Sequence, residues 1–200
     1  MATKTSTPTT SPSYDPSRYS AFAVTVDVVV LTVASGELQV LLVRRGVPPF
    51  EGIWAIPGGF KRPVETLDDA ARRELAQETG VDGAGLLVQF GAYGDPGRDP
   101  RMSVVTVAYL AVRREVAGMV AGTDAAAASM VPVSLVLGAK LRLAFDHNRL
   151  VRDAVERVRA DLDLTGGATA FVGAAFTQPS SATTFRRKFA PSRRTPQTAS

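Results

Sequence analysis

Two glutamates four residues apart, Glu74 and Glu78, constrain this chain most, because they lie in its clearest helical segment. Thr66 and Asp69 have the spacing of a helix capping box, and Gly80 can end the helix. Four residues are about one helical turn, so both carboxylates project from one face. Two such charges repel unless a cation neutralises them, and a hard cation such as Mg²⁺ prefers oxygen ligands.

The surroundings of this helix bear on two interpretations. A helix face rich in Glu and Arg is most often solvated surface with ordinary ion pairs between successive turns. Gly58 and Gly59 favour a metal site instead, because they place flexible backbone with accessible carbonyls just before the helix. Glu65 and Arg73 could form a charge network that orients Glu74, which also favours a site.

The segment from residue 59 to residue 81 resembles the Nudix box, written Gly-x5-Glu-x7-Arg-Glu-U-x-Glu-Glu-x-Gly-U, where U is a bulky aliphatic residue. Eight of the nine defined positions match: Gly59, Glu65, Arg73, Glu74, Leu75, Glu78, Gly80 and Val81. The exception is Gln77, where the family has Glu. The resemblance implies an α/β protein, the Nudix α/β/α sandwich with a mixed sheet, followed here by a short basic C-terminal extension.

The resemblance also implies roles. It assigns catalytic roles to Glu65, Arg73 and Glu74, and metal-binding roles to Gly59, Glu74, Gln77 and Glu78. Glu74 is then a ligand or the base that activates water, and the metal is Mg²⁺, with Mn²⁺ as a substitute. The implied reaction is hydrolysis of a nucleoside diphosphate linked to another group. Gln77 keeps an oxygen donor but brings no charge, which predicts weaker metal binding and a slower enzyme or a binding-only descendant.

A larger part of the chain, about residues 14 to 176, resembles one Nudix subgroup, the bacterial Nudix-related transcriptional regulators of NAD metabolism. The matching segments are Tyr14–Tyr19, Phe50–Phe60, Gly94–Arg101 and Ala144–His147. Those relatives bind ADP-ribose or related NAD metabolites and carry a winged helix-turn-helix domain after the Nudix domain. Some hydrolyse ADP-ribose and others do not. They are often dimers, so the resemblance also implies a homodimer.

Residues beyond the box bear on the substrate. Pro96 lies fifteen residues past the box, where ADP-ribose-cleaving Nudix proteins often have proline, although turn chemistry explains a proline there equally well. Arg98 and Arg101 can bind phosphate bidentately or lie on a solvated loop. Trp54 is a candidate platform for adenine or a core residue. The single histidine, His147, is expected to pack against or cap a helix.

The last 37 residues, from Leu164 onward, carry five basic and no acidic side chains, whereas the rest of the chain is nearly neutral. The basic residues Arg186, Arg187 and Lys188 are therefore candidates for weak DNA binding without sequence preference. A winged helix-turn-helix needs about sixty residues, so this extension is interpreted as a truncated remnant or a basic tail. The expected organisation is a leader at 1–20, a Nudix domain at 21–163 and the extension at 164–200.

Periodicity predicts strands at 21–33, 38–44, 54–56, 86–93, 102–112 and 130–132, with helices at 67–79 and 143–162. The chain has no cysteine, and its longest apolar run has twelve residues, too short to span a bilayer. These features favour a soluble cytoplasmic protein without membrane partners.

Three hypotheses follow. The leading one is a Mg²⁺-dependent Nudix hydrolase acting on ADP-ribose or a similar nucleoside diphosphate compound. The second is a transcriptional regulator that senses ADP-ribose or another NAD metabolite, with weak or no hydrolysis. The third is a binding module that has lost catalysis.

Overall fold

Strand β1 (Ala23–Ala34) is the centre of the fold, because its valine-rich sequence can be buried on both faces. The structure, a computed structural model, describes residues 15–81, 86–113, 116 and 125–164. In this part of the chain β1 pairs antiparallel with β2 (Glu37–Arg45) and parallel with β6 (Val104–Val112). The sheet is therefore mixed, as the sequence predicts.

The remaining strands extend this sheet on both sides. The order along its main path is β3-β2-β1-β6-β5, while β4 pairs with β1 and β7 pairs with β2. Their bounds are β3 (Trp54–Ala55), β4 (Gly58–Phe60), β5 (Val88–Tyr93) and β7 (Ala125–Pro132). The glycine pair of β4, Gly58 and Gly59, lies opposite Asp27 and Val26 of β1.

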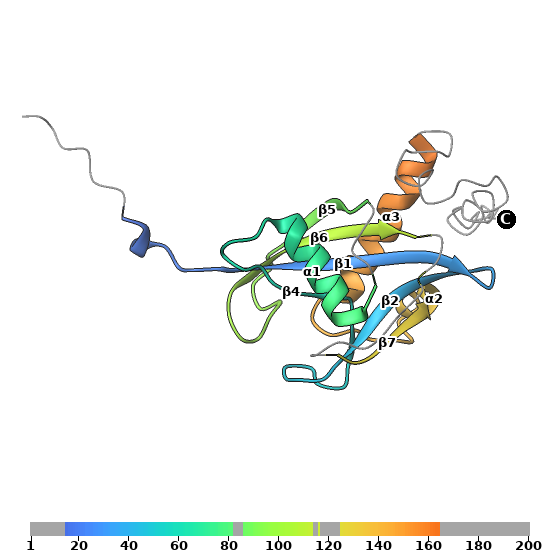
Figure 1. The fold of residues 1–200 in the computed structure, drawn as a ribbon, viewed down its shortest axis with the longest axis horizontal. Helices are drawn as coiled ribbons and strands as arrows, with labels where there is room; N and C mark the ends of the chain where they lie inside the picture. The colour runs from blue at the N-terminus through green and yellow to red at the C-terminus, as the bar shows by residue number, and fades with distance from the viewer. Residues whose placement is uncertain (1–14, 82–85, 114–115, 117–124, 165–200) are drawn as a thin grey trace, which may run out of the picture.

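Helices cover both faces of the sheet, so the described residues form an α/β/α sandwich (Figure 1). Helix α1 (Leu67–Thr79) lies on one face, and its buried side chains Ala70, Ala71 and Leu75 pack on Val26, Val28 and Val30 of β1. Helices α2 (Val133–Leu137) and α3 (His147–Leu164) lie on the other, packed on a cluster that contains Val29 and Leu31. Successive β1 residues thus serve opposite cores, as strand geometry requires.

Helix α1 has the ends that its sequence predicts. The Thr66 hydroxyl accepts a hydrogen bond from the Asp69 backbone N–H, and the Asp69 carboxylate accepts one from the Thr66 N–H. Gly80 ends the helix in the left-handed conformation at φ 67°. This reciprocal cap fixes where the helix begins, and therefore where its later glutamates point.

Most predicted elements are confirmed, and the differences have physical reasons. Strand β4 and helix α2 were not predicted, because a glycine pair and a five-residue apolar segment give little periodic signal. Strand β7 begins at Ala125 rather than 130, since pairing with β2 overrides the weak strand preference of alanine. Helix α3 begins at His147 rather than 143, because the preceding residues include Phe145 in the left-handed conformation.

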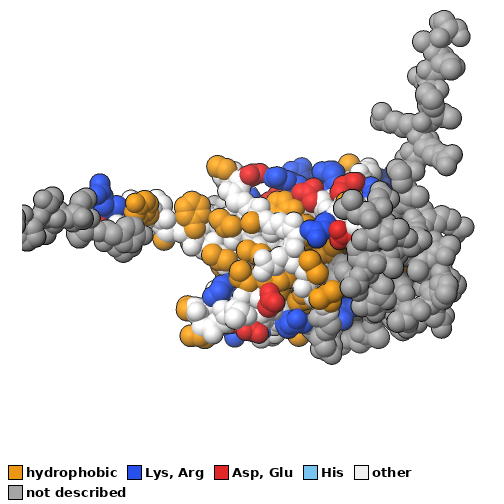
Figure 2. All heavy atoms as spheres, turned by 90° about the horizontal axis from the view of Figure 1, so that it is seen from above, with side chains coloured by type: hydrophobic (Ala, Val, Ile, Leu, Met, Phe, Trp, Pro, Cys, Tyr) orange, Lys and Arg blue, Asp and Glu red, His pale blue; other side chains and the backbone are white. Residues whose placement is uncertain are grey.

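The first described residues project from the body as an extended segment (Figures 1 and 2). This segment contains a short 3-10 helix, η1 (Pro16–Arg18), and exposes the hydrophobic side chains Tyr19 and Phe22. No helix in the described part of the chain is both long and apolar enough to cross a bilayer.

Candidate active site

Gly58 and Gly59 bring the backbone of β4 into close contact with β1 and with the Glu74 side chain of α1. A Cβ at Gly58 would lie 2.4 Å from the Val26 carbonyl oxygen, and one at Gly59 would lie 2.5 Å from Glu74 Oε1. Both distances are shorter than real Cβ contacts, so a side chain at Gly58 would collide with the backbone of β1, and one at Gly59 would displace the carboxylate of Glu74. The glycine pair is therefore a built part of the site and more than a flexible turn.

Glu78 is directed back toward this glycine pair from the last turn of α1. Its Oε2 accepts a hydrogen bond of 2.9 Å from the Gly58 backbone N–H. Burial raises the pKa of Glu78 to about 7, the Gly58 hydrogen bond opposes that rise, and the charges of Glu74 and Asp27 add to it. The carboxylate is thus placed where a cation would favour its ionised form.

Arg73 fixes the orientation of the neighbouring carboxylate, Glu74. Its Nε and Nη2 donate to both oxygens of Glu65 at 2.9 and 2.6 Å, and its Nη1 donates to Glu74 Oε1 at 2.5 Å. Nη1 also lies 3.2 Å from Gln77 Oε1, and Nη2 donates to the Phe60 carbonyl. A bidentate arginine is a rigid support, so Glu74 has little orientational freedom.

The ion pair also affects protonation. Hydrogen bonds from Arg73 and from the Arg62 backbone N–H lower the pKa of Glu65 to about 2. The same pairing raises the pKa of Arg73 above its usual value, chiefly through Glu65 and against the effect of burial. Glu65 and Arg73 therefore keep their charges throughout the physiological pH range. The charge network that the sequence suggested is present.

The donors on this side of the site suit a hard cation. Glu74 and Glu78 supply carboxylate oxygens, Gln77 an amide oxygen and Gly59 a backbone carbonyl, the ligand types that Mg²⁺ accepts. Among the described residues no group of three or more His, Asp or Glu side chains is arranged to hold a metal. Mg²⁺ commonly takes one or two carboxylates and completes its shell with water and substrate phosphate, so the set fits a site completed by its ligand.

A second wall faces these residues from the loop between β5 and β6 and from the start of α3. Arg98, whose side chain is only 5% exposed, donates from Nη2 to Asp146 Oδ1 at 2.7 Å and from Nε to Oδ2 at 3.1 Å. Its Nη2 also lies 3.5 Å from Asp27 Oδ2. The sequence allowed a solvated Arg98, whereas the structure buries it in an ion pair that ties the loop to the N-terminus of α3.

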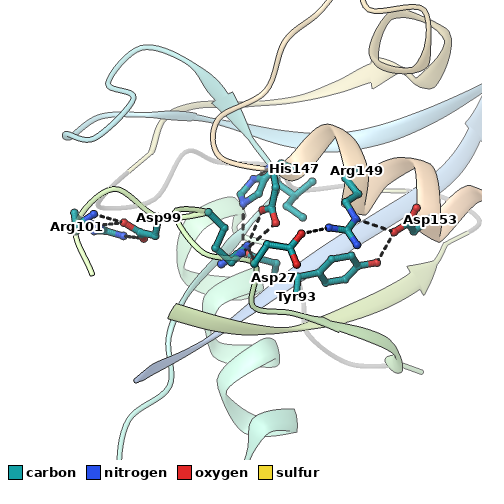
Figure 3. Close-up of polar contacts among 11 residues, drawn as sticks. Asp27, Tyr93, Asp99, Arg101, His147, Arg149 and Asp153 are labelled. Carbon is teal, nitrogen blue, oxygen red and sulfur yellow. Dashed lines mark hydrogen bonds and ion pairs between the residues drawn. The ribbon is translucent and has the colours of Figure 1, made fainter. Parts of the chain in front are cut away.

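His147 lies beside this ion pair and is buried. Its Nδ1 accepts a hydrogen bond of 3.1 Å from the Ile56 backbone N–H. Its Nε2 lies 3.6 Å from Asp27 Oδ1 (Figure 3). Burial lowers the pKa of His147, and the charges of Asp27 and Asp146 oppose that effect. A neutral ring with its proton on Nε2 satisfies both contacts. The sequence predicted that His147 packs against or caps a helix, whereas its ring contacts the Ile56 backbone and Asp27 of β1 and lines the site.

Arg101 completes the second wall through aromatic contacts. It forms an ion pair with Asp99, which lowers the pKa of that carboxyl, and its guanidinium lies 5.2 Å from the Phe60 ring centroid and 5.9 Å from that of Phe145. Its side chain is still 41% exposed. Arg101 therefore retains surface that can contact a ligand.

These two walls enclose one cavity of about 710 Å³, here called the site cavity. Of the site residues predicted from the sequence, those that line the cavity are Gly59, Arg73, Glu74, Gln77, Glu78, Arg98 and Arg101. Glu65 reaches it through Arg73, whereas Pro96 lines a neighbouring cavity. Trp54 packs against the core below α3 and lines neither cavity. Arg186, Arg187 and Lys188 lie outside the described residues.

Several lining residues were not predicted from the sequence. Asp27 gives the clearest missed signal, since it is a lone carboxylate in a run of valines and is 6% exposed. Arg45, Asp99 and Phe145 carry no comparable pattern, because each reaches the cavity from a separate segment.

The fold and this geometry agree with the comparison against known families. A family model described as the NUDIX domain matches residues 21–154. The chain belongs to the Nudix family. The match contains both walls of the site cavity, from Asp27 to His147, and extends well beyond the box itself.

Two relatives of this Nudix chain are named for different functions. It is 35% identical over 147 residues to the ADPR responsive transcriptional repressor NtrR of Acinetobacter baylyi. The aligned region covers 72% of this chain and 58% of the repressor. It is 34% identical over 117 residues to an ADP-ribose pyrophosphatase of Methanocaldococcus jannaschii, covering 58% of this chain and 64% of that enzyme. The chain thus spans less than two thirds of either relative.

A solved structure gives a third likeness. The NUDIX domain of Shewanella oneidensis NrtR, crystallised with ADP-ribose, is 36% identical to this Nudix chain. The two superpose with a TM-score of 0.65 over 72% of this chain and 93% of that domain. Both the repressor and the pyrophosphatase are relatives whose names refer to ADP-ribose.

Proposed function

We propose that the chain is a Nudix pyrophosphohydrolase that cleaves the diphosphate of a nucleoside diphosphate compound, with ADP-ribose as the first substrate to test. One observation carries the proposal: Glu74 and Glu78 meet beside the Gly58–Gly59 backbone in a cavity whose opposite wall presents Arg101. Carboxylates for a cation on one side and a cation for phosphate on the other are what diphosphate hydrolysis needs.

Each residue of the site has a distinct role in this reaction. Glu78, Glu74, the Gly59 carbonyl and Gln77 would hold Mg²⁺ or Mn²⁺, which when bound neutralises phosphate oxygens and favours hydroxide formation. Arg73 bonds Glu74 at Oε1, so we assign contact with the attacking water to Oε2. Arg101 orients the phosphates from the opposite wall. Glu65 acts through Arg73 and is a positioning residue.

Gln77 favours a second candidate function, a sensor that binds ADP-ribose with little or no hydrolysis. Its Oε1 accepts a hydrogen bond from Arg73 at 3.2 Å, and as an amide it contributes no charge toward a cation. A relative that is an ADPR responsive repressor supports this candidate. The basic extension, including Arg186, Arg187 and Lys188, would then bind DNA. The protein would form a homodimer, as the resemblance to Nudix-related regulators implies.

The two functions separate in one assay. Purified protein is incubated with ADP-ribose and Mg²⁺, and AMP release is followed by chromatography. We expect Glu78→Gln to lower the rate more than about 100-fold. Mutating residues that only support metal ligands already lowers metal affinity or activity about 10- to 100-fold, and Glu78 is a proposed ligand itself. Glu37→Gln, the same change at an exposed position outside the cavity, is the matched control and should keep the wild-type rate.

Other outcomes decide against the hydrolase. Equal AMP release by wild type and Glu78→Gln would assign the product to a contaminant. Tight ADP-ribose binding without product, together with a salt-resistant shift of a promoter fragment, would establish the regulator. Binding without product and without a DNA shift would leave a binding module.

A further inference from the structure

The segment from Trp54 to Gly59 carries the backbone carbonyl of Gly59 that the proposed function assigns to the metal. Strands β3 and β4, with which it begins and ends, are only two and three residues long, so sheet pairing gives it few hydrogen bonds. On the β1 side, the Pro57 carbonyl accepts a hydrogen bond of 2.8 Å from the Val28 N–H. On the opposite side, the position of the segment depends on contacts with the start of α3.

His147, the first residue of α3, makes the side-chain contact on that side. Its Nδ1 accepts a hydrogen bond of 3.1 Å from the N–H of Ile56, three residues before Gly59. The Ala144 N–H donates to the Trp54 carbonyl at 2.8 Å, so the chain leading into α3 holds the segment at a second point. His147 and Ile56 are 4% and 2% exposed, and a buried backbone N–H is rarely left without a partner. The ring acceptor therefore fixes where Ile56 lies.

Asp27 determines which ring nitrogen is available to Ile56. Its Oδ1 lies 3.6 Å from His147 Nε2, and its negative charge favours the neutral tautomer that carries the proton there (Figure 3). Nδ1 is then unprotonated and can accept a hydrogen bond. Asp27 is also the β1 partner of Gly58, so the carboxylate that orients the ring lies beside the strand that the ring supports.

We propose that His147 is a positioning residue, whose Nδ1 holds the Ile56–Gly59 backbone in the position that lets its carbonyl and Glu78 share a cation. The inference rests on the proposed function, because it concerns the metal site of that reaction. The same backbone donates from the Gly58 N–H to Glu78 Oε2 at 2.9 Å, so a shift at Ile56 would move a carbonyl ligand and release a carboxylate ligand together. Functional geometries tolerate displacements of only about 0.5 Å.

Two substitutions of His147 separate this acceptor from the rest of the ring. The asparagine oxygen lies as many bonds from Cβ as Nδ1 does, whereas both polar atoms of glutamine lie one bond further out, as Nε2 does. Mn²⁺ alone is titrated into the full chain, and free Mn²⁺ is followed by electron paramagnetic resonance. We expect His147→Gln to weaken Mn²⁺ binding about tenfold, the scale for residues that support metal ligands, and His147→Asn to keep near wild-type affinity.

Hydrogen exchange followed by mass spectrometry gives a second readout that needs no metal. Peptides containing Ile56–Gly59 should exchange faster in His147→Gln than in wild type and His147→Asn. Tyr93→Phe is the matched control, because it removes a 3.0 Å hydrogen bond from Tyr93 to Asp153 that also joins the sheet to α3, and neither residue lines the site cavity (Figure 3). We expect this control to leave Mn²⁺ binding and exchange of the segment unchanged.

Several outcomes would overturn the proposal. They are failure of wild type to bind Mn²⁺, wild-type Mn²⁺ affinity in folded His147→Gln, equal weakening in His147→Asn and His147→Gln, and equal weakening in Tyr93→Phe. Should His147→Gln unfold, nitrogen-15 NMR of the wild-type ring replaces it. An unprotonated Nδ1 supports the proposal, whereas a proton on Nδ1 would overturn it, because that nitrogen could no longer accept from Ile56.

The two proposals fail in distinguishable ways. If ADP-ribose is never cleaved yet Mn²⁺ affinity depends on the acceptor at residue 147, the positioning role stands and the hydrolase falls. If wild type cleaves ADP-ribose and His147→Gln has wild-type Mn²⁺ affinity, the hydrolase stands and the positioning role falls.

Discussion

The two walls of the site cavity are built in opposite ways. The helix wall, formed by Arg73, Glu74, Gln77 and Glu78 of α1, comes from one continuous turn-and-a-half of helix. The loop wall, formed by Arg98, Arg101, Phe145 and His147, comes from segments about fifty residues apart. The first is ordered by helix geometry and a local cap, the second by buried ion pairs across the fold. Their different origins predict different responses to mutation.

The largest expected effect on stability lies in the loop wall. Asp146→Ala leaves the nearly buried guanidinium of Arg98 with only the longer contact to Asp27, so we expect a loss of about 3 kcal/mol of unfolding free energy. Urea unfolding measures this. The matched change Asp161→Ala, at a more exposed ion pair of α3, should cost less than about 1 kcal/mol. Equal losses at the two positions would contradict the structural role of Arg98.

The helix wall should respond in activity more than in stability. Gln77→Glu restores a full charge beside Glu78, and we expect it to raise turnover about tenfold at limiting Mg²⁺ if the added term resembles a charge-assisted contact of 1–2 kcal/mol. Steady-state rates across a Mg²⁺ titration measure this, with the difference vanishing at saturation. An unchanged titration midpoint would mean that residue 77 does not reach the metal.

The smallest net effect is the pH dependence of stability, because the two walls contribute to it in opposite directions. The pKa of His147 is lowered by burial, so the unfolded chain binds the proton more readily and His147 reduces stability as pH falls below about 6.5. The pKa of Glu78 is raised to about 7, so the folded chain holds that proton more tightly and stability declines as pH rises from about 4.5 to about 7. Each slope is at most about 1.4 kcal/mol per pH unit.

Removing one group at a time should reveal how the other changes the free energy of unfolding between pH 5 and 6.5. Without metal, Glu78→Gln should leave stability increasing with pH, whereas His147→Asn, which keeps an acceptor for the Ile56 N–H, should leave it decreasing. Unfolding midpoints across this range measure both. Parallel pH profiles in the two variants would remove the assignment of either group.

The helix wall was predictable because its information is local. The spacing of Glu74 and Glu78, the cap at Thr66 and the ending at Gly80 all act within one helix, and the structure has each of them. The loop wall was predictable only as a set of candidates. Arg98 and Arg101 could be named, but no local pattern shows that the first is buried on Asp146 and the second lies over aromatic rings.

The sequence by itself determined the family, the mixed α/β fold and the carboxylate face of α1, because hydrophobic periodicity and box spacing are written in consecutive residues. Tertiary structure decided what faces that helix. It placed Asp27 among the site residues, packed Trp54 against the core instead of the site, and joined Phe50 to Phe145 around a second cavity. The physical reason is that contacts between distant segments depend on how the sheet and helices pack together, which no spacing along the chain records.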